Sequence, residues 1–394
     1  MSKHSFDVAV VGGGPAGCRT AELIARSGHS VGIIEEHANI GEPMQCAGLI
    51  TPRCFDILGY GRETILNEIR GADIVSPSGQ FMGIGNENVR VLSIDRAAFD
   101  RKIRDKALDA GAVLASGSRV KDFQRRDGTV SLNNEEYRAK LVIGADGARS
   151  ATRKWLGLEE PTFQLNGLGA DISGLDMEED RVKIFFGRDI APNFFAWLIP
   201  AGDVTRLGLC VRGADGTAND YFKRLFKNGE SSKLLAKAKV IRTHSGIIPL
   251  GMLPRTHADN GMVVGDAACQ VKATSGGGIY PGLVCARHCA ETAVAALEAD
   301  DYSAKKLGKY HESWTTDIGD ELEKALMMHR IYSDLDDAQL EDIFGMMLNP
   351  EIQEIINRVG DIDYPSRLGW TLLRKEPGLL KYTGKFLKHG ILGR

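Results

Sequence analysis

Three closely spaced glycines give the sequence its clearest chemical signal. Gly12, Gly14 and Gly17 form a G-x-G-x-x-G turn directly after an apolar run and at the start of a helical pattern. Such a turn lets a pyrophosphate approach the backbone, and the helix that follows directs unpaired N–H groups at it. Glu35 ends the next apolar run, where an acid accepts hydrogen bonds from ribose hydroxyls. A glycine turn on its own is not evidence of a ligand. Here the turn stands in register with a strand, a helix, a second strand and an acid, and this combination predicts a dinucleotide site.

Two further glycine-containing turns follow apolar runs later in the chain. The first is Gly-Ala-Asp-Gly at 144–147, and the second begins with Gly265 and Asp266. Residues 276–278 are glycines that open a helix with Pro281 in its first turn. Because ligands of an open α/β sheet bind beyond the carboxyl ends of its strands, we expect these turns to face the same cofactor as the first.

A long irregular stretch, residues 37–52, carries the candidate catalytic residue, Cys46. Connections of this length in a compact domain are usually functional. Its neighbours Ala47 and Gly48 are small enough to lie flat against a ring system, which would place the thiol where it could relay a proton. A buried structural cysteine is the alternative. Arg96 stands in the first turn of a predicted helix, where a cation is unfavourable, so it is either exposed or in contact with the cofactor.

The predicted elements set these residues in an α/β fold. Apolar runs that alternate with helical patterns over residues 1–160 and 250–300 predict a discontinuous nucleotide-binding domain of Rossmann type. Between them, residues 161–249 show short alternating patterns, which predict an inserted antiparallel sheet that would bind the substrate. Residues 301–394 show the pattern of a helical C-terminal region.

Composition narrows the classes of function. Of 394 residues 43% are hydrophobic, and the formal charge is −3, so a packed core is expected and a nucleic-acid partner is not. The seven cysteines include no C-x-x-C pair, which is typical of a reducing compartment and offers no metal-site spacing. No leader is apparent before the first strand, and no apolar run reaches the ~18–20 residues of a membrane span. We therefore expect a cytoplasmic protein without a metal.

The glycine turn with Glu35 and the turns at 144–147 and 265–266 together resemble the FAD-dependent para-hydroxybenzoate-hydroxylase-like fold over most of residues 1–300. The resemblance implies FAD as the cofactor. It also implies cofactor-binding residues beside the glycine turn, namely Ala16, Glu35, Cys46, Ala47, Leu49, Arg96, Val120, Asp266, Gly278 and Ile279. Asp266 would hold the ribityl chain, and the helix after residues 276–278 would direct N–H groups at the flavin N1–C2=O edge.

Within this fold the chain most resembles the archaeal geranylgeranyl reductases, which saturate the isoprenoid chains of ether lipids. Residues 192–200 resemble that family's P-x-x-Y-x-W-x-F-P signature, with Phe195 in place of Tyr and Ile199 in place of Phe. The loop with Cys46 also resembles the family's cysteine loop near the flavin. The resemblance implies an isoprenoid glycerolipid substrate bound by Phe195, Trp197 and Pro200. An ordinary core strand is the alternative for residues 192–200.

The reaction that this resemblance implies is stepwise reduction of isolated C=C bonds, with hydride from N5 of reduced FAD. An unactivated alkene develops carbocation character, so water must be kept away from it. An apolar tunnel would do this, with a wall made of Phe185, Phe194, Phe195 and Trp197. The electron donor stays open between reduced ferredoxin and NAD(P)H, because the sequence has no second G-x-G-x-x-G unit.

The motifs leave two other functions open. One is an FAD-dependent aromatic monooxygenase, since nothing in the cofactor motifs excludes hydroxylation. The other is a non-catalytic protein that binds flavin or lipid. Residues 195–200 also resemble the W-x-W-x-I-P of flavin halogenases, but residues 71–89 lack the lysine that halogenation requires.

The C-terminal residues 366–394 combine basic and hydrophobic side chains. They contain seven Lys or Arg residues and one acid, Glu376, interleaved with leucines and aromatic residues. A basic amphipathic segment of this kind predicts an anionic membrane surface as a partner, so the protein would be peripheral at the membrane. A helix packed on the core with a charged outer face is the equal alternative.

Overall fold

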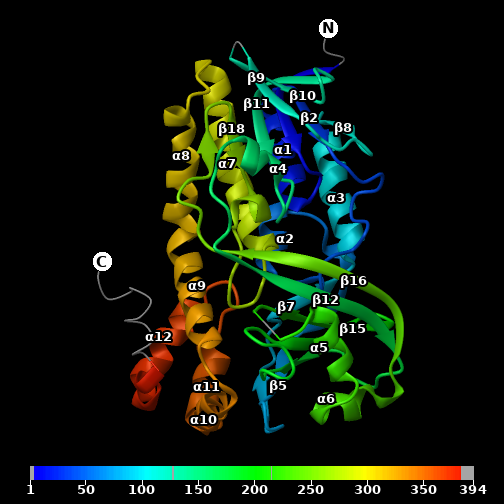
Figure 1. The fold of residues 1–394 in the computed structure, drawn as a ribbon, viewed down its shortest axis with the longest axis vertical. Helices are drawn as coiled ribbons and strands as arrows, with labels where there is room; N and C mark the ends of the chain where they lie inside the picture. The colour runs from blue at the N-terminus through cyan, green and yellow to red at the C-terminus, as the bar shows by residue number, and fades with distance from the viewer. Residues whose placement is uncertain (1–3, 127, 214, 383–394) are drawn as a thin grey trace.

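Two sheets lie one above the other along the long axis of the molecule, and a column of helices runs beside both (Figure 1). This computed structural model describes residues 4–126, 128–213 and 215–382. Within them the predicted class is confirmed: a Rossmann-like α/β domain, an antiparallel sheet and a helical C-terminal region.

The first sheet is mostly parallel and is centred on β1 (His4–Val11). Its described strands follow the order β17-β18-β11-β1-β2-β8, and β10 and β9 extend it beside β11. Because β1 pairs in parallel with β2 (Val31–Ile34) and β11 (Tyr137–Gly144), the carboxyl ends of these strands meet at one edge. The remaining strands are β8 (Val113–Ala115), β9 (Phe123–Arg126), β10 (Thr129–Leu132), β17 (His257–Ala258) and β18 (Gly261–Val263).

Three helices bury one face of this sheet. α1 (Pro15–Arg26) packs against both α3 (Arg96–Asp109) and α7 (Ile279–Ala299). Ala21, Cys285 and Cys289 are fully buried in the shared core, so these cysteines fill space between helices, as expected from the sequence. The shorter helical segments of this region are α2 (Arg53–Leu58), η1 (Arg62–Thr64), α4 (Ala151–Trp155) and η3 (Gly265–Ala268).

The second sheet has the order β16-β12-β15-β14-β13-β5-β6. Five strands come from the predicted insertion: β12 (Phe163–Ser173), β13 (Arg181–Phe185), β14 (Ala196–Ala201), β15 (Val204–Val211) and β16 (Lys239–Leu250). One face packs against α5 (Ala218–Leu225), α6 (Gly229–Leu234) and η2 (Leu235–Lys237), and the other faces the first sheet's domain.

The boundaries of this sheet differ from the predicted substrate segment. β5 (Gly71–Val75) and β6 (Phe81–Gly85) belong to it, although residues 1–160 were assigned to the nucleotide domain. β5 pairs in parallel with β13, in a register that joins Gly71 to Arg181. Such a pairing joins segments far apart in the chain, so local patterning cannot reveal it. A third, small sheet contains β3 (Leu49–Ile50), β4 (Ile65–Ile69) and β7 (Val91–Ile94).

The C-terminal helices form the column at the left of Figure 1. They are α8 (Ala304–Trp314), the π-helical turn η4 (Thr315–Gly319), α9 (Asp320–Ser333), α10 (Asp337–Met347), α11 (Pro350–Val359), α12 (Pro365–Lys375) and η5 (Pro377–Tyr382). Among residues 4–382, leaving out 127 and 214, no helix combines the length and apolarity that crossing a bilayer requires.

Candidate active site

A cavity of about 2010 Å³ connects the glycine turn at residue 12 with the C-terminal helices α11 and α12. Its walls come from the nucleotide domain, the loop around Cys46, the second sheet and the segment 356–368. Ordinary small-molecule pockets measure roughly 300–1,000 Å³, so this one has room for a dinucleotide and a long second ligand.

The glycine turn lies where β1 passes into α1. Gly12 has a φ of +105°, and a Cβ there would lie 2.3 Å from the Ala145 carbonyl oxygen, so the turn touches the 144–147 turn. A Cβ on Gly14 would meet nothing within 4 Å, because this side faces the cavity. Gly17 does not line the cavity; it lets α1 pack against the turn, since a Cβ would lie 2.2 Å from Gly12 O. Ala16 lines the cavity at the uncapped N-terminus of α1.

Glu35 lies at the carboxyl end of β2, beside this turn. Its Oε2 accepts a hydrogen bond from the Gly13 N–H at 2.6 Å, and its Oε1 accepts one from the His37 N–H at 2.8 Å. The residue is 8% exposed and lines the cavity, as does Val120. Each carboxylate oxygen can accept more than one hydrogen bond, so Glu35 can also receive ribose hydroxyls.

Arg96 reaches the cavity from the first turn of α3. Its Nε donates to Asp100 Oδ1 at 2.7 Å, and the side chain is 16% exposed. Burial lowers the pKa of Arg96, but Asp100 and Cys46 raise this pKa by a larger amount. The pKa of Arg96 therefore lies above its usual range. The arginine is therefore a fixed cation in the cavity wall and not an exposed surface residue.

Asp266 lies in η3, immediately after β18. It lines the cavity and accepts no side-chain hydrogen bond from the residues that the structure describes. Burial raises the pKa of its carboxyl more than the nearby Arg96 lowers it. A Cβ on Gly278 would lie 2.7 Å from Asp266 Oδ1, so the fold brings Asp266 against the glycines that precede α7. Ile279, the first residue of α7, also lines the cavity.

The loop with Cys46, Ala47 and Leu49 crosses between the two sheets and lines the cavity. The Gly48 N–H donates to Cys46 Sγ at 3.4 Å, which fixes the thiol locally. From the second sheet, Arg206 Nη1 donates to the Ala47 carbonyl oxygen at 2.8 Å. Sequence reasoning missed Arg206, because nothing in its local pattern distinguishes it from other strand residues.

An aromatic wall forms the side of the cavity nearest the second sheet. Phe194 and Phe195 stack with ring centroids 4.2 Å apart, and Trp197 meets Phe195 edge-on at 6.0 Å. The Trp197 indole lies flat over β15 because residue 208 is glycine: a Cβ there would be 2.5 Å from Trp197 Cζ2. These three residues and Phe186 line the cavity.

Two residues predicted for this wall do not lie in it. Pro200 is buried in β14 and does not line the cavity, whereas Trp197 and Ile199 do. Side chains of a strand alternate between faces, so Pro200 points away from the face that carries Trp197. Phe185 is likewise buried on the far face of the second sheet, among the residues that pack against α5, and Phe186 takes its place.

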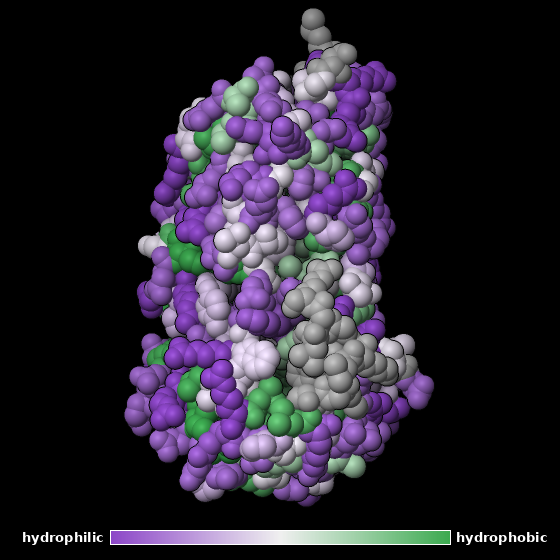
Figure 2. Space-filling view, turned by 90° about the vertical axis from the view of Figure 1, so that its left-hand side faces the viewer, coloured by the Kyte–Doolittle hydropathy of each residue, from purple (hydrophilic) through white to green (hydrophobic). Residues whose placement is uncertain are grey.

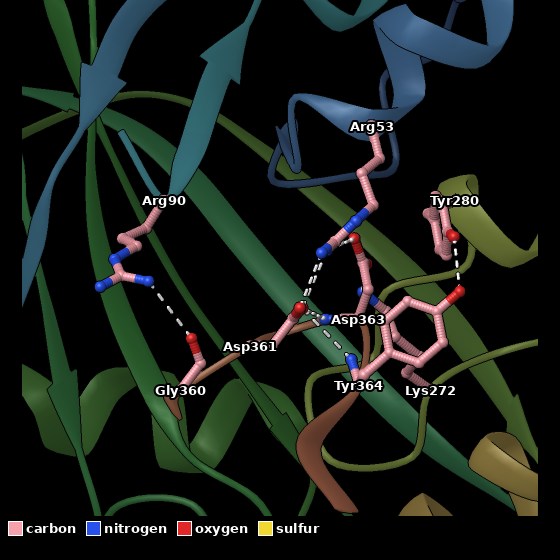
Figure 3. A network of polar contacts seen from close by, with 8 residues as sticks. All are labelled: Arg53, Arg90, Lys272, Tyr280, Gly360, Asp361, Asp363 and Tyr364. Atoms are coloured by element: carbon pink, nitrogen blue, oxygen red, sulfur yellow. Dashed lines mark hydrogen bonds and ion pairs between the residues drawn. The ribbon is translucent and has the colours of Figure 1, made fainter. Parts of the chain in front are cut away.

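The segment between α11 and α12 closes the cavity on the C-terminal side (Figure 3). Arg53 of α2 donates to Asp361 Oδ2 at 2.7 Å and to Asp363 Oδ2 at 3.1 Å. The hydroxyls of Tyr280 and Tyr364 lie 2.8 Å apart. Sequence reasoning placed none of these residues in the site, because they come together only when the C-terminal helices pack on the nucleotide domain.

The residues around the first half of the cavity fit FAD. An open glycine turn, two helix N-termini without an acidic residue in the first turn, and the partly buried carboxylate of Asp266 offer complementary groups for pyrophosphate, flavin edge and ribityl hydroxyls. The residues assigned from the sequence to the cofactor, apart from Gly17, all line this one cavity.

Comparison with known proteins agrees with this fit. A family model described as an FAD binding domain matches residues 5–313, so the chain is a flavoprotein of the FAD-binding class. It is 32% identical to an uncharacterized protein of Methanocaldococcus jannaschii, over 95% of this chain and 96% of that one. It is 31% identical to digeranylgeranylglycerophospholipid reductase 2 of Methanopyrus kandleri, over 97% of this chain and 100% of that one. The chain belongs to the digeranylgeranylglycerophospholipid reductase family.

A solved structure shows the same fold. The geranylgeranyl bacteriochlorophyll reductase-like protein of Thermoplasma acidophilum superimposes with a TM-score of 0.84 at 24% identity, covering 97% of this chain and 99% of that one. FAD as cofactor and the family expected from the sequence are therefore confirmed.

Proposed function

We propose that this protein is an FAD-dependent reductase that saturates the C=C bonds of geranylgeranyl chains in archaeal-type ether phospholipids. The observation that carries the proposal is one continuous cavity that joins the dinucleotide turn to an aromatic wall. A long apolar chain in the second half of this cavity would meet the cofactor at the loop with Cys46. The names of the relatives, digeranylgeranylglycerophospholipid reductases, support this substrate class.

Reduced FAD, when bound, supplies hydride from N5 to one alkene carbon. The protein's part is to hold the alkene and exclude water while positive charge develops on the carbon that accepts the hydride. Phe194, Phe195 and Trp197 present apolar surface for this, and Gly208 lets the indole lie flat beneath the chain. These three aromatic side chains carry no acidic or basic group that could react with the developing positive charge.

We assign delivery of the proton to Cys46 Sγ. The loop that carries the thiol is held by Arg206 on one side, and Sγ accepts the Gly48 N–H on the other. When the thiol gives its proton to the second alkene carbon, a thiolate remains. The Arg96 guanidinium, which interacts with Cys46, would stabilise that thiolate until water restores the proton.

The test is mass spectrometry of a digeranylgeranyl glycerophospholipid incubated with the FAD-loaded protein and dithionite. We expect two added hydrogens for each reduced bond, and no change when the protein is omitted. Oxygen-dependent hydroxylation of an aromatic acid, without alkene reduction, would instead identify a monooxygenase. Bound FAD with no turnover of either substrate would identify a non-catalytic flavin or lipid carrier.

The physiological electron donor is either reduced ferredoxin or NAD(P)H. Both can be tested by anaerobic bleaching of the flavin absorbance with each donor in turn. Rapid bleaching by NAD(P)H alone would make a protein donor unnecessary, whereas bleaching only by reduced ferredoxin would require a docking surface for it.

An anionic membrane surface is a further proposed partner. Figure 2 shows hydrophobic residues on the lower part of the face formed by the C-terminal helices. Trp370 of α12 is 50% exposed. Lys375 pairs with Glu351 at 2.7 Å and Lys381 pairs with Asp342, so part of the segment is a packed helical region with neutralised charges. Arg367 and Arg374 form no ion pair within residues 4–382, and Lys385, Lys388 and Arg394 lie outside the described residues.

Vesicle co-sedimentation tests this partner. Truncation after Lys375 should reduce binding to anionic vesicles while leaving FAD content unchanged. Each cation near a charged surface contributes up to ~1 kcal/mol, and salt should weaken the binding of the full chain. Equal binding of the full and truncated chains, or binding that salt does not affect, would contradict the proposed membrane partner. The segment would then be interpreted as a helix packed on the core.

A further inference from the structure

Lys272, which lines the cavity, forms a buried ion pair with Asp363, which lies behind the cavity wall. Lys272 Nζ lies 2.5 Å from Asp363 Oδ1, and the two side chains are 5% and 0% exposed. Figure 3 shows Arg53 directed at the same group, with Asp361 beside it. Two cations and two carboxylates therefore balance within this cluster. Pairing offsets the burial of the lysine charge, but buried ion pairs in proteins are often no more stable than hydrophobic pairs of similar volume, so such a pair is weak evidence for a purely stabilising role.

The lysine belongs to the turn that precedes α7. Its N–H donates to Gly277 O at 3.2 Å, and the Gly276 N–H donates to Lys272 O at 2.8 Å, which closes residues 272–277 into a tight turn. A Cβ on Gly277 would lie 3.0 Å from Lys272 Cε and 3.3 Å from Nζ. The ammonium therefore lies against the glycines, and both Lys272 and Gly277 line the cavity.

This turn concentrates positive potential and unused donors. α7 has 21 residues, no side-chain cap and no acidic residue in its first turn, so its positive end faces the turn. The Ser275 hydroxyl is buried and has no hydrogen-bond partner among the described residues. A cation close to a helix N-terminus is itself unfavourable. The combination suits a ligand that carries negative charge at this point.

We infer that Lys272 tunes the bound flavin and that Asp363 is its positioning residue. Two-electron reduction of FAD with one proton taken up at N5 leaves one negative charge at the N1–C2=O edge. Beside the turn 276–278, that charge would face the Lys272 ammonium, which stabilises the reduced ring and raises its reduction potential. Asp363 holds the ammonium from the C-terminal region, so packing of that region sets the redox property of the cofactor. The inference rests on the proposed placement of the flavin and not on the identity of the lipid.

The test is the midpoint potential of the bound FAD, measured anaerobically with dithionite, reference dyes and no lipid. Lys272→Met removes the charge. The double variant Lys272→Met with Asp363→Asn removes both charges. It serves if the single variant fails to fold because the buried Asp363 carboxylate then has lost its partner Lys272 and relies on Arg53. Asp361→Asn is the matched control, because Asp361 binds Arg53 but makes no contact with Lys272.

Both lysine variants should retain FAD and shift the reduction equilibrium at least tenfold toward the oxidised form, which is about 30 mV for a two-electron couple. The control should keep the wild-type potential. A wild-type potential in either lysine variant that binds FAD would overturn the inference, and so would an equal shift in Asp361→Asn, since loosening of the segment would then explain it. Loss of FAD from all three variants would show that the cluster has a structural role, and this result would also overturn the inference. Failed alkene reduction at an altered potential would count against the lipid substrate only.

Discussion

Arg206 Nη1 donates a hydrogen bond to the Ala47 carbonyl oxygen at 2.8 Å, across 159 residues of sequence. The same nitrogen donates to the Ile94 carbonyl oxygen at 2.9 Å. A buried side chain of the second sheet thereby fixes the loop that carries Cys46 to the end of β7. The second sheet and the nucleotide-binding domain thus meet at the loop to which we assign delivery of the proton.

Arg206→Met should loosen this junction. It removes both hydrogen bonds and takes a cation from Asp171, whose Oδ1 lies 3.8 Å from Arg206 Nε. Breaking a buried pair in this way typically costs about 3–5 kcal/mol. We expect a lower unfolding free energy in urea and new protease cleavage within residues 41–48. Arg242→Met is the control, because Arg242 also pairs with Asp171 but is 61% exposed. Equal cleavage of both variants would mean that Arg206 does not hold the loop.

Asp266→Ala should weaken FAD binding far more than Cys46→Ala does. The Asp266 carboxylate has no hydrogen-bonding partner within the described residues, so ribityl hydroxyls are its expected donors. Hydrogen bonds to a charged group contribute ~1.5–3 kcal/mol, which is roughly 10- to 100-fold in Kd. Flavin absorbance after desalting measures retention. If both variants kept the same amount of FAD, Asp266 would have to be removed from the cofactor site.

Cys46→Ser should reduce lipid more slowly than wild type but faster than Cys46→Ala. A positioned proton donor contributes about 10²–10⁴-fold to rate, and serine keeps size and a proton whereas alanine keeps neither. Single-turnover oxidation of the reduced flavin by the lipid gives the rate. A wild-type rate in Cys46→Ala would assign the proton to another donor, most simply an ordered water.

Trp197→Ala should impair geranylgeranyl chains more than shorter isoprenoid chains. An aromatic side chain presents ~150–250 Å², and contact over a third of it contributes about 1–2 kcal/mol at ~25 cal/mol per Å². We expect kcat/KM to fall about tenfold for the long chain. Phe81→Ala, at an exposed position of β6 outside the cavity, should leave it unchanged. A loss independent of chain length would mean that Trp197 does not line the path of the chain.

Acidification should destabilise the protein through His329. Burial, with Arg212 and Arg330, lowers the pKa of this histidine from 6.5 to about 4. The unfolded chain therefore binds a proton before the folded one does, and stability is lost as the pH falls from about 6.5 toward 4. At 1.36 kcal/mol per pH unit this amounts to about 3 kcal/mol.

His329→Gln isolates that effect from the other histidines. Urea unfolding at several pH values between 7 and 4 should show a shallower loss of stability in the variant. If the plots of unfolding free energy against pH were parallel for the two proteins, His329 would have an ordinary pKa in the folded state. That result would contradict the effect expected from its burial beside Phe194.

Much of the cofactor half of the site could be predicted because its determinants are local. Gly12 and Gly17 belong to a single strand–turn–helix unit: Gly12 has a φ of +105°, and a Cβ on Gly17 would lie 2.2 Å from Gly12 O. Asp266 could also be predicted locally, because it follows a buried strand and precedes a glycine-rich helix start. Pro200 could also have been placed correctly, since the alternation of β14 that directs Trp197 inward directs Pro200 outward.

The sequence by itself determined the FAD-binding fold and its glycine turns, because short-range sterics and hydrophobic periodicity encode them, and the resemblance of its motifs indicated the family. Only the tertiary structure decided which distant segments share the cavity. β5 joins the second sheet through a parallel pairing with β13, and Lys272 meets Asp363 across 91 residues. Such contacts depend on how buried surfaces fit once the elements pack, and no local pattern carries that information. The C-terminal wall of the cavity and its buried ion pair therefore appear only in the folded molecule.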